Sequence, residues 1–266
     1  MEKDAIGIFD SGVGGLTVFS KIKSEFPNEN IVYLGDTKNF PYGGKSSDEI
    51  IKYSIQNVKD LIEKGAKMIV IACGTATSQA IDVLRQKFDI PIIGIIEPTV
   101  EYIKEQNIKR VGVIATKGTI QNGAWETKLK QAIPNIEVIN KACPMLAEIA
   151  EEGRAQSPEG RKVIKEYMEI FKQNKIDKII LGCTHYPIYE NIIREEFEYE
   201  IELIHTGETV AKYLKKYLKE NGLENRGEKG TETIYLTKPE AEFEKIAKNI
   251  MKIETKIQEN TPKSLT

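Results

Sequence analysis

The chain has 266 residues, of which 40% are hydrophobic, and its 38 basic and 40 acidic side chains leave a net charge of −2. This near balance gives no electrostatic basis for nucleic-acid binding. No run approaches the roughly 18–20 apolar residues that a membrane span requires, so we expect no spanning segment.

Short β-rich runs alternate with longer stretches of helical period along the chain. Strands are predicted, in chain order, at 6–9, 31–35, 68–72, 91–95, 111–115, 178–182 and 201–205. Helices are predicted near 16–26, over 46–65 with Ser47 as the cap and Gly65 as the end, and from about Ala76. We expect a loop over 222–230 and a frayed tail over the last dozen residues. Continuously apolar strands between helices predict an α/β protein with doubly wound parallel sheets covered on both faces.

Two pairs of segments resemble each other. GIFDSG (7–12) resembles GVIATKG (112–118), and LIEKGAKMIVIACGT (61–75) resembles FKQNKIDKIILGCTH (171–185). A duplication would predict two lobes related by a pseudo-twofold axis, formed by residues 1–97 plus 206–266 and by residues 98–205. Their ligand site would lie between them, at the C-terminal edges of the sheets. The alternative is chance similarity between βα units.

The three cysteines include no C-x-x-C pair. Free thiols predict a reducing, cytoplasmic setting, and the first twelve residues show no basic-then-apolar pattern of a secretory signal. Cys73 and Cys183 each end an apolar strand and precede a threonine, which is where free backbone N–H groups favour anions and thiolates. Two thiols on opposite sides of a substrate could remove a proton from one face of a carbon and deliver another to the opposite face. The alternative is that both cysteines are small, buried hydrophobic residues. We expect this structural role for Cys143.

Other polar residues follow the strand ends. Asp10 and Ser11 open the turn FDSGVGGL (9–16), where Asp10 could hold an ammonium group and the backbone N–H groups a carboxylate, unless the turn is merely a helix cap. Its glycine spacing does not match a dinucleotide-binding motif. Tyr42 lies in the loop GDTKNFPYGGKS (35–46) and could donate a hydrogen bond, although such loops are often only connectors. His185 could assist the thiol of Cys183 or be structural, and a zinc site would need more ligands than these residues supply.

Taken together, FDSGVGGL, GDTKNFPYGGKS, the first cysteine motif and LGCTHYP (181–187) resemble the motifs of the glutamate racemases, within the aspartate/glutamate racemase family. The resemblance covers essentially residues 5–215 and continues more weakly through YLTKPEAEF (235–243). It implies two flavodoxin-like lobes with the active site between them, and a cytoplasmic enzyme that needs no cofactor or metal and supplies D-glutamate for peptidoglycan. It also implies a homodimer.

The resemblance assigns roles to particular residues. It makes Cys73 the base that deprotonates D-glutamate and Cys183 the base that deprotonates L-glutamate. The auxiliary acid–base residues would be Asp10, His185 and Glu152, with the neighbouring Glu151 left open by the sequence MLAEIAEEG (145–153). The residues that would bind substrate are Asp10, Ser11, Tyr42, Gly43, Gly74, Thr75, Thr116, Thr119, Thr184 and His185.

One position departs from the family. The family usually has C-N-T-A at the first cysteine, and here Gly74 replaces the asparagine, which removes a side-chain amide from the substrate site. Affinity and selectivity are therefore open, and so is the alternative of a racemase for aspartate or another acidic amino acid. A non-catalytic ligand-binding α/β protein is the alternative from a different class.

Overall fold

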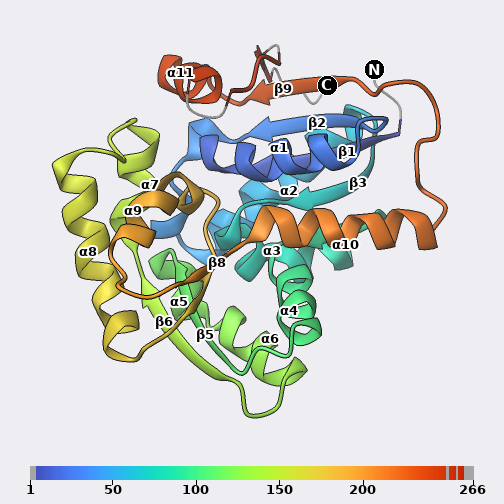
Figure 1. Ribbon diagram of the computed structural model, residues 1–266. Helices are drawn as coiled ribbons and strands as arrows, with labels where there is room; N and C mark the ends of the chain where they lie inside the picture. The colour runs from blue at the N-terminus through green and yellow to red at the C-terminus, as the bar shows by residue number, and fades with distance from the viewer. Residues whose placement is uncertain (1–3, 250–251, 256, 261–266) are drawn as a thin grey trace.

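Two parallel β-sheets organise the chain (Figure 1). The structure, a computed structural model, describes residues 4–249, 252–255 and 257–260. The first sheet has the strand order β10-β9-β2-β1-β3-β4, and the second has the order β6-β5-β7-β8. The strands of the first sheet are β1 (Ala5–Asp10), β2 (Asn30–Gly35), β3 (Ala66–Ile71), β4 (Ile92–Gly94), β9 (Glu232–Leu236) and β10 (Ile257–Glu259). Those of the second are β5 (Arg110–Ala115), β6 (Glu137–Ala142), β7 (Lys178–Leu181) and β8 (Glu202–His205).

The order β6-β5-β7-β8 of the second sheet repeats the order β2-β1-β3-β4 within the first. Strand β1 corresponds to β5 in this comparison, and β3 corresponds to β7. This is the arrangement that a duplicated unit would produce. The α/β class and the two parallel-sheet lobes are confirmed, and the pseudo-twofold axis stays a prediction.

Helices cover both faces of the first sheet. Successive residues of a strand point to opposite faces, and Ile8 packs with Phe19 of α1 (Leu16–Glu25), whereas Phe9 packs with Leu61 of α2 (Ser47–Glu63). Helix α10 (Thr206–Glu220) lies beside α1, and α3 (Gly74–Lys87) lies beside α2. Strands β1–β4 are largely buried on both sides, which explains their mostly apolar sequences.

The second sheet is covered in the same way. On one face lie α7 (Pro144–Glu151), α8 (Pro158–Gln173) and α9 (Glu190–Glu195). On the other lie α6 (Ala124–Ala132) and α4 (Ile96–Glu105), and the short α5 (Lys117–Asn122) follows β5. Helix α4 packs against both α6 and α10, so one hydrophobic core runs from the first sheet to the second. Helix α11 (Ala241–Asn249) contacts α7 and the turn Val13–Gly15.

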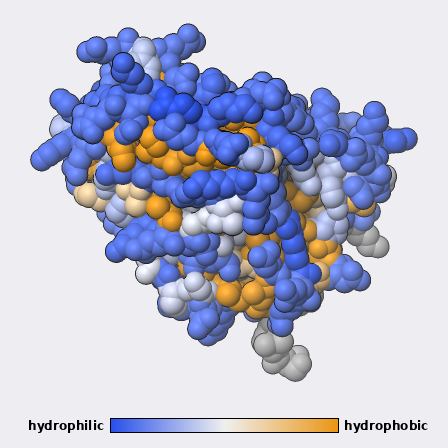
Figure 2. Space-filling model, turned by 90° about the horizontal axis from the view of Figure 1, so that it is seen from below, coloured by the Kyte–Doolittle hydropathy of each residue, from blue (hydrophilic) through white to orange (hydrophobic). Residues whose placement is uncertain are grey.

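The division into residues 1–97 plus 206–266 and residues 98–205 stays a proposal. Strands β1–β4, β9 and β10 join the first sheet and β5–β8 the second, but the boundary at residue 97 falls inside α4. No helix in the described part of the chain is both long and apolar enough to cross a membrane. Seen from below, the surface is mainly hydrophilic, with apolar residues gathered in separate areas (Figure 2).

Several local predictions were wrong. Ser46, not Ser47, caps α2 and forms a capping box with Glu49. Helix α3 begins at Gly74 rather than near Ala76. Strands β6, β9 and β10 were not predicted, and β10 lies within the expected frayed tail. Asn260 is buried at the end of that segment, whereas residues 261–266 lie outside the described part.

Candidate active site

Cys73 lies where strand β3 gives way to helix α3, at the edge of the first sheet. Because α3 begins at Gly74, Cys73 caps the helix, and the Ala76 N–H donates to its Sγ at 3.5 Å. Its own S–H points to Ser11 Oγ, 3.9 Å away. Burial and then the charge of Asp10 raise the pKa of the Cys73 thiol, against the effect of the Ala76 N–H. The protonated thiol is therefore the favoured form of Cys73.

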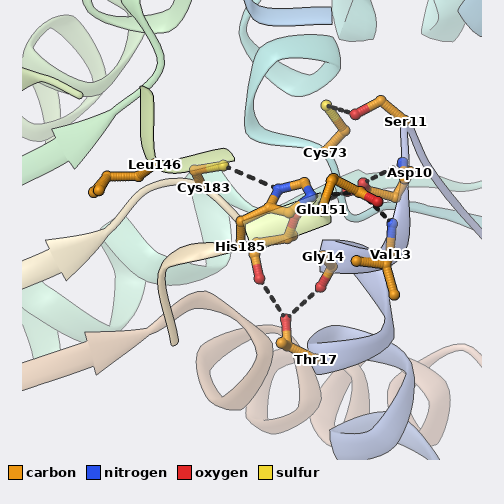
Figure 3. A network of polar contacts seen from close by, with 12 residues as sticks. Asp10, Ser11, Val13, Gly14, Thr17, Cys73, Leu146, Glu151, Cys183 and His185 are labelled. Carbon is orange, nitrogen blue, oxygen red and sulfur yellow. Dashed lines mark hydrogen bonds and ion pairs between the residues drawn. The ribbon is translucent and has the colours of Figure 1, made fainter. Parts of the chain in front are cut away.

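Cys183 follows strand β7, at the corresponding edge of the second sheet. Its Sγ lies 3.5 Å from Nδ1 of His185, and Nε2 of the same ring lies 2.7 Å from Glu151 Oε1 (Figure 3). That oxygen also accepts the Val13 N–H at 2.6 Å. An ionised carboxylate only accepts hydrogen bonds, so the pattern assigns a hydrogen to Nε2. In the neutral ring, Nδ1 is then free to accept the proton of Cys183.

His185 is buried, with 2% of its surface exposed. Burial lowers the pKa of His185, but the hydrogen bonds to Cys183 and Glu151 outweigh this effect and hold the pKa well above its usual value. A protonated imidazole beside a cysteine stabilises the thiolate. The site thus combines a thiol that favours its protonated form, Cys73, with a thiol whose ionised form has a cationic partner, Cys183.

Asp10 ends strand β1 and joins the two sheets. Its carboxylate accepts the Gly12 N–H and the Thr184 hydroxyl, each at 3.0 Å, and Thr184 belongs to the second lobe. Burial raises the pKa of Asp10 to about 6, although the charge of His185 and these two hydrogen bonds oppose the rise. Asp10 is therefore a buried group that titrates close to neutral pH.

The structure places Glu151, not Glu152, beside His185. The Glu152 side chain is 55% exposed, and its Oε2 accepts a hydrogen bond from Arg154 Nε at 2.7 Å. Successive residues on a helix point about 100° apart, so only one of two neighbours at the end of α7 can face the site. The choice of Glu152 over its neighbour is therefore corrected.

Three buried threonine hydroxyls connect the lobes at the other side of the site. Thr75 Oγ1 lies 2.9 Å from Thr116 Oγ1, and Thr119 Oγ1 lies within hydrogen-bond distance of both. Thr116 caps α5, and Thr119 donates its backbone N–H to that cap. Thr75 and Thr116 line the cavity, whereas Thr119 lies behind them.

The hydroxyl of Tyr42 is bonded to residues that do not line the cavity. It donates to Asp36 Oδ2 at 2.5 Å and accepts from Asn57 Nδ2 at 3.1 Å. Tyr42 and Gly43 are nevertheless among the residues that border the cavity. The expectation that Tyr42 belongs to the site therefore agrees with its position, but its hydroxyl is already engaged.

A cavity of about 150 Å³ lies between the two thiols and brings most of the predicted residues together. Its lining is Ser11, Phe40, Pro41, Tyr42, Gly43, Gly44, Cys73, Gly74, Thr75, Thr116, Lys117, Pro144, Ala147, Glu148, Cys183, Thr184 and His185. Two lining residues, the cation Lys117 and the anion Glu148, were not predicted from the sequence. The available signals were adjacency of Lys117 to Thr116 and the three-residue spacing of Glu148 from Glu151, which puts both glutamates on one side of α7.

Gly74 lies against the strand end that carries the second thiol. A Cβ atom on Gly74 would lie 2.3 Å from the carbonyl oxygen of Gly182, closer than atoms in contact allow. The glycine thus permits a close backbone approach between the lobes. Among the described residues, no group of three histidine, cysteine, aspartate or glutamate side chains is arranged to hold a metal ion.

Two thiols border one cavity from corresponding edges of two parallel sheets, an arrangement that fits a racemase-like α/β protein. Comparison with known sequences gives the family. The chain belongs to the Asp/Glu/Hydantoin racemase family, whose profile matches residues 22–241.

Individual relatives agree with this assignment. A glutamate racemase of Aquifex aeolicus is 39% identical over 255 residues, which cover 95% of this chain and 96% of the relative. The crystal structure of glutamate racemase isoform RacE1 from Bacillus anthracis is similar, with a TM-score of 0.92, 31% identity and 97% coverage of both chains. The glutamate racemase of Francisella tularensis in complex with D-glutamate has a TM-score of 0.90 and 35% identity, also with 97% coverage of both chains.

Proposed function

We propose that the chain interconverts L- and D-glutamate by transferring protons at the α-carbon between two thiols, without a cofactor. The observation that carries the proposal is that Cys73 and Cys183 border one cavity from opposite sheets. The membership in the racemase family and the extensive likeness to glutamate racemases support glutamate as the substrate.

The proton states of the site fit one direction of this reaction directly. With L-glutamate, the Cys183 thiolate takes the α-proton, and the electron pair of the broken C–H bond is delocalised into the α-carboxylate. The Cys73 thiol then gives its proton to the opposite face of the carbon, which yields D-glutamate. The products are a Cys183 thiol and a Cys73 thiolate, the form that accepts D-glutamate in the reverse direction. Exchange of protons with solvent restores the starting state.

The acid–base neighbours would support each thiol separately. We assign Glu151 and His185 to Cys183, because His185 Nδ1 faces that sulfur. We assign Asp10 to the Cys73 side, because its charge acts on the Cys73 thiol. Removing either set should therefore impair one of the two proton transfers more than the other.

Groups around the cavity would hold the substrate. The backbone N–H groups of Gly74 and Thr75 open α3, and the N-terminus of a helix attracts carboxylates. They would also stabilise the negative charge that develops on the α-carboxylate. Ser11, Gly43, Thr116 and Thr184 border the same space, and Thr119 supports Thr116 from behind.

The test is racemisation by the purified chain without added cofactor. L-glutamate, D-glutamate and L-aspartate are each incubated with the wild type, Cys73→Ser and Cys183→Ser, and optical rotation is followed. We expect loss of rotation with both glutamate enantiomers, little change with aspartate and no racemisation by either variant. No change with any substrate would contradict racemase activity. Preferential use of aspartate would reassign the substrate, and full activity of both variants would reject the thiol mechanism.

The wider role in this proposal is supply of D-glutamate for peptidoglycan by a cytoplasmic homodimer. The motif resemblance and the glutamate racemase relatives support this role. Complementation of a D-glutamate-requiring bacterial strain by the gene would test the supply, and analytical ultracentrifugation would test the dimer. Failure to restore growth despite activity in vitro would contradict the role in the cell.

A further inference from the structure

The turn after strand β1 touches the acid–base pair that faces Cys183. A Cβ atom on Gly12 would lie 2.0 Å from Glu151 Oε1, and one on Gly14 would lie 2.6 Å from Nδ1 of the His185 ring. Both glycines belong to the first lobe, whereas Glu151 and His185 belong to the second. Because positions 12 and 14 carry no side chain, there is room for the side chains of Glu151 and His185.

Backbone conformation does not explain the glycine at position 12. Gly12 has φ −162°, which is extended and open to any residue. The neighbours of a Cβ there would be Glu151 and a Phe40 ring atom at 3.1 Å. An alanine at position 12 would therefore clash with the Glu151 side chain, whereas the backbone of the turn would tolerate it.

Hydrogen bonds fix the pair in this space. The N–H of Val13, between the two glycines, donates to Glu151 Oε1 at 2.6 Å (Figure 3). The Thr17 hydroxyl is shared between the carbonyl oxygens of Gly14 at 2.8 Å and Thr184 at 3.1 Å. This shared hydroxyl holds the loop that carries Cys183 and His185 to the turn of the first lobe.

We propose that Gly12 and Gly14 are positioning residues: together with the Val13 N–H, they seat the Glu151–His185 pair against Cys183. The first lobe then orients the Glu151–His185 pair beside Cys183, although all three residues belong to the second lobe. The pair therefore takes up this arrangement only when the lobes are in contact. The inference rests on the proposed function for its catalytic meaning, but the seat itself is a geometric claim about Glu151, His185 and Cys183.

The steric consequence of a methyl group is large. A carbon and an oxygen in contact need a separation of more than about 3 Å, so the methyl group in Gly12→Ala would displace the Glu151 carboxylate by roughly 1 Å. A misplacement of that size at a catalytic group can lower the rate about a hundredfold. Glu151→Asp shortens the side chain by one methylene and makes room for the methyl, at the expense of its reach to His185.

The test measures alkylation of Cys183 by iodoacetamide against pH, with the labelled peptides quantified by mass spectrometry. The variants are Gly12→Ala, Glu151→Asp and the double variant, with Gly227→Ala in an exposed loop as the matched control. We expect Gly12→Ala to slow the alkylation of Cys183 at neutral pH by roughly tenfold, because the imidazolium is no longer held beside the thiolate. In the Glu151→Asp background the same change should have less than about a third of that effect. Cys73 alkylation and the control should match the wild type.

Each outcome decides the proposal. The proposed positioning role would be contradicted if Cys183 in Gly12→Ala were alkylated as in the wild type. It would also be contradicted if Gly12→Ala changed Cys183 alkylation equally in the wild-type and Glu151→Asp backgrounds. If Gly12→Ala does not fold, the double variant Gly12→Ala/Glu151→Ala is prepared. Restored folding would show that the alanine methyl group at position 12 and the Glu151 side chain compete for the same space, and continued misfolding would overturn the proposal. Because alkylation needs no substrate, failure of the racemase assay would leave this result interpretable.

Discussion

A Cβ atom on Gly74 would lie 2.3 Å from the carbonyl oxygen of Gly182. The backbone at Gly74 therefore meets the backbone at Gly182 with no side chain between them. Gly74 comes directly after Cys73, and Gly182 directly before Cys183. The close approach therefore fixes how near the two reactive edges can be. Gly74, the residue that differs from the C-N-T-A motif expected for the family, thus lies at one of the contacts between the lobes.

Replacing Gly74 should impair both stability and activity. The blocking atom at position 182 is backbone, which cannot rotate away, so Gly74→Ala should lower the free energy of unfolding by about 1–3 kcal/mol. It should also lower kcat/KM for glutamate by roughly tenfold or more by moving the thiols apart. Gly74→Asn, which restores the family residue, should show the same losses. Denaturant unfolding and racemisation assays check both variants, and a more active Gly74→Asn would show that the lobes separate without harm.

Asp10 should make the free energy of unfolding depend on pH in the acidic range. Below its usual pKa of 3.8, the carboxyl is protonated in both folded and unfolded chains. As the pH rises towards about 6, the unfolded carboxyl loses its proton while the buried one keeps it, so the stability that Asp10 contributes is lost over this window. The loss should reach roughly 3 kcal/mol. The unfolding free energy of the wild type minus that of Asp10→Asn, measured against pH, should fall by this amount, and a flat or rising difference would be inconsistent with the buried carboxyl.

The hydroxyl of Tyr42 should matter for stability and not for substrate binding. It is bonded to Asp36 and Asn57, so Tyr42→Phe leaves the buried Asp36 short of a donor, which should destabilise the protein by about 1–3 kcal/mol. KM for glutamate should stay within about threefold of the wild type, because the ring remains. A large rise in KM with unchanged stability would instead make the hydroxyl a substrate ligand.

The C-terminal segment should contribute to the stability of the first lobe. Asn260 donates to the buried Asp60 Oδ2 at 2.7 Å, and its backbone N–H bonds to the Leu236 carbonyl. Asn260→Ala should therefore lower the free energy of unfolding by about 1–3 kcal/mol, because a buried carboxylate loses a donor. Gln258→Ala, at an exposed position of β10, is the matched control. Equal stabilities of the two variants would mean that the segment is not anchored.

Most strands were predictable from the sequence, including β4 and β8 at sheet edges, but β6, β9 and β10 were not. Strands such as β1 and β7 are buried on both faces, so their apolar runs identify them directly. Strand β6, with the sequence EVINKA, lies at a sheet edge and carries polar residues on partly exposed positions. Strand β10 depends on pairing with β9, and its own three residues carry no strand pattern.

The site was predictable where strand ends supply it. Cys73 and Cys183 each follow an apolar strand and Asp10 is the last residue of one, so their meeting at the sheet edges could be expected from the sequence. The choice between Glu151 and Glu152 required the orientation of α7, and the roles of Gly12 and Gly14 required knowledge of which side chains oppose them across the lobes. Such contacts between distant segments leave no local pattern.

The most direct test of the two-thiol account is the fate of the α-proton in D₂O. L-glutamate is converted by the wild type and, early in the reaction, the remaining L-glutamate and the newly formed D-glutamate are separated and analysed for deuterium at the α-carbon. If Cys183 removes the proton and Cys73 delivers another to the opposite face, the D-glutamate carries solvent deuterium while the remaining L-glutamate keeps its protium. Protium retained in the D-glutamate, or deuterium appearing equally fast in both enantiomers, would indicate a single base and contradict the account.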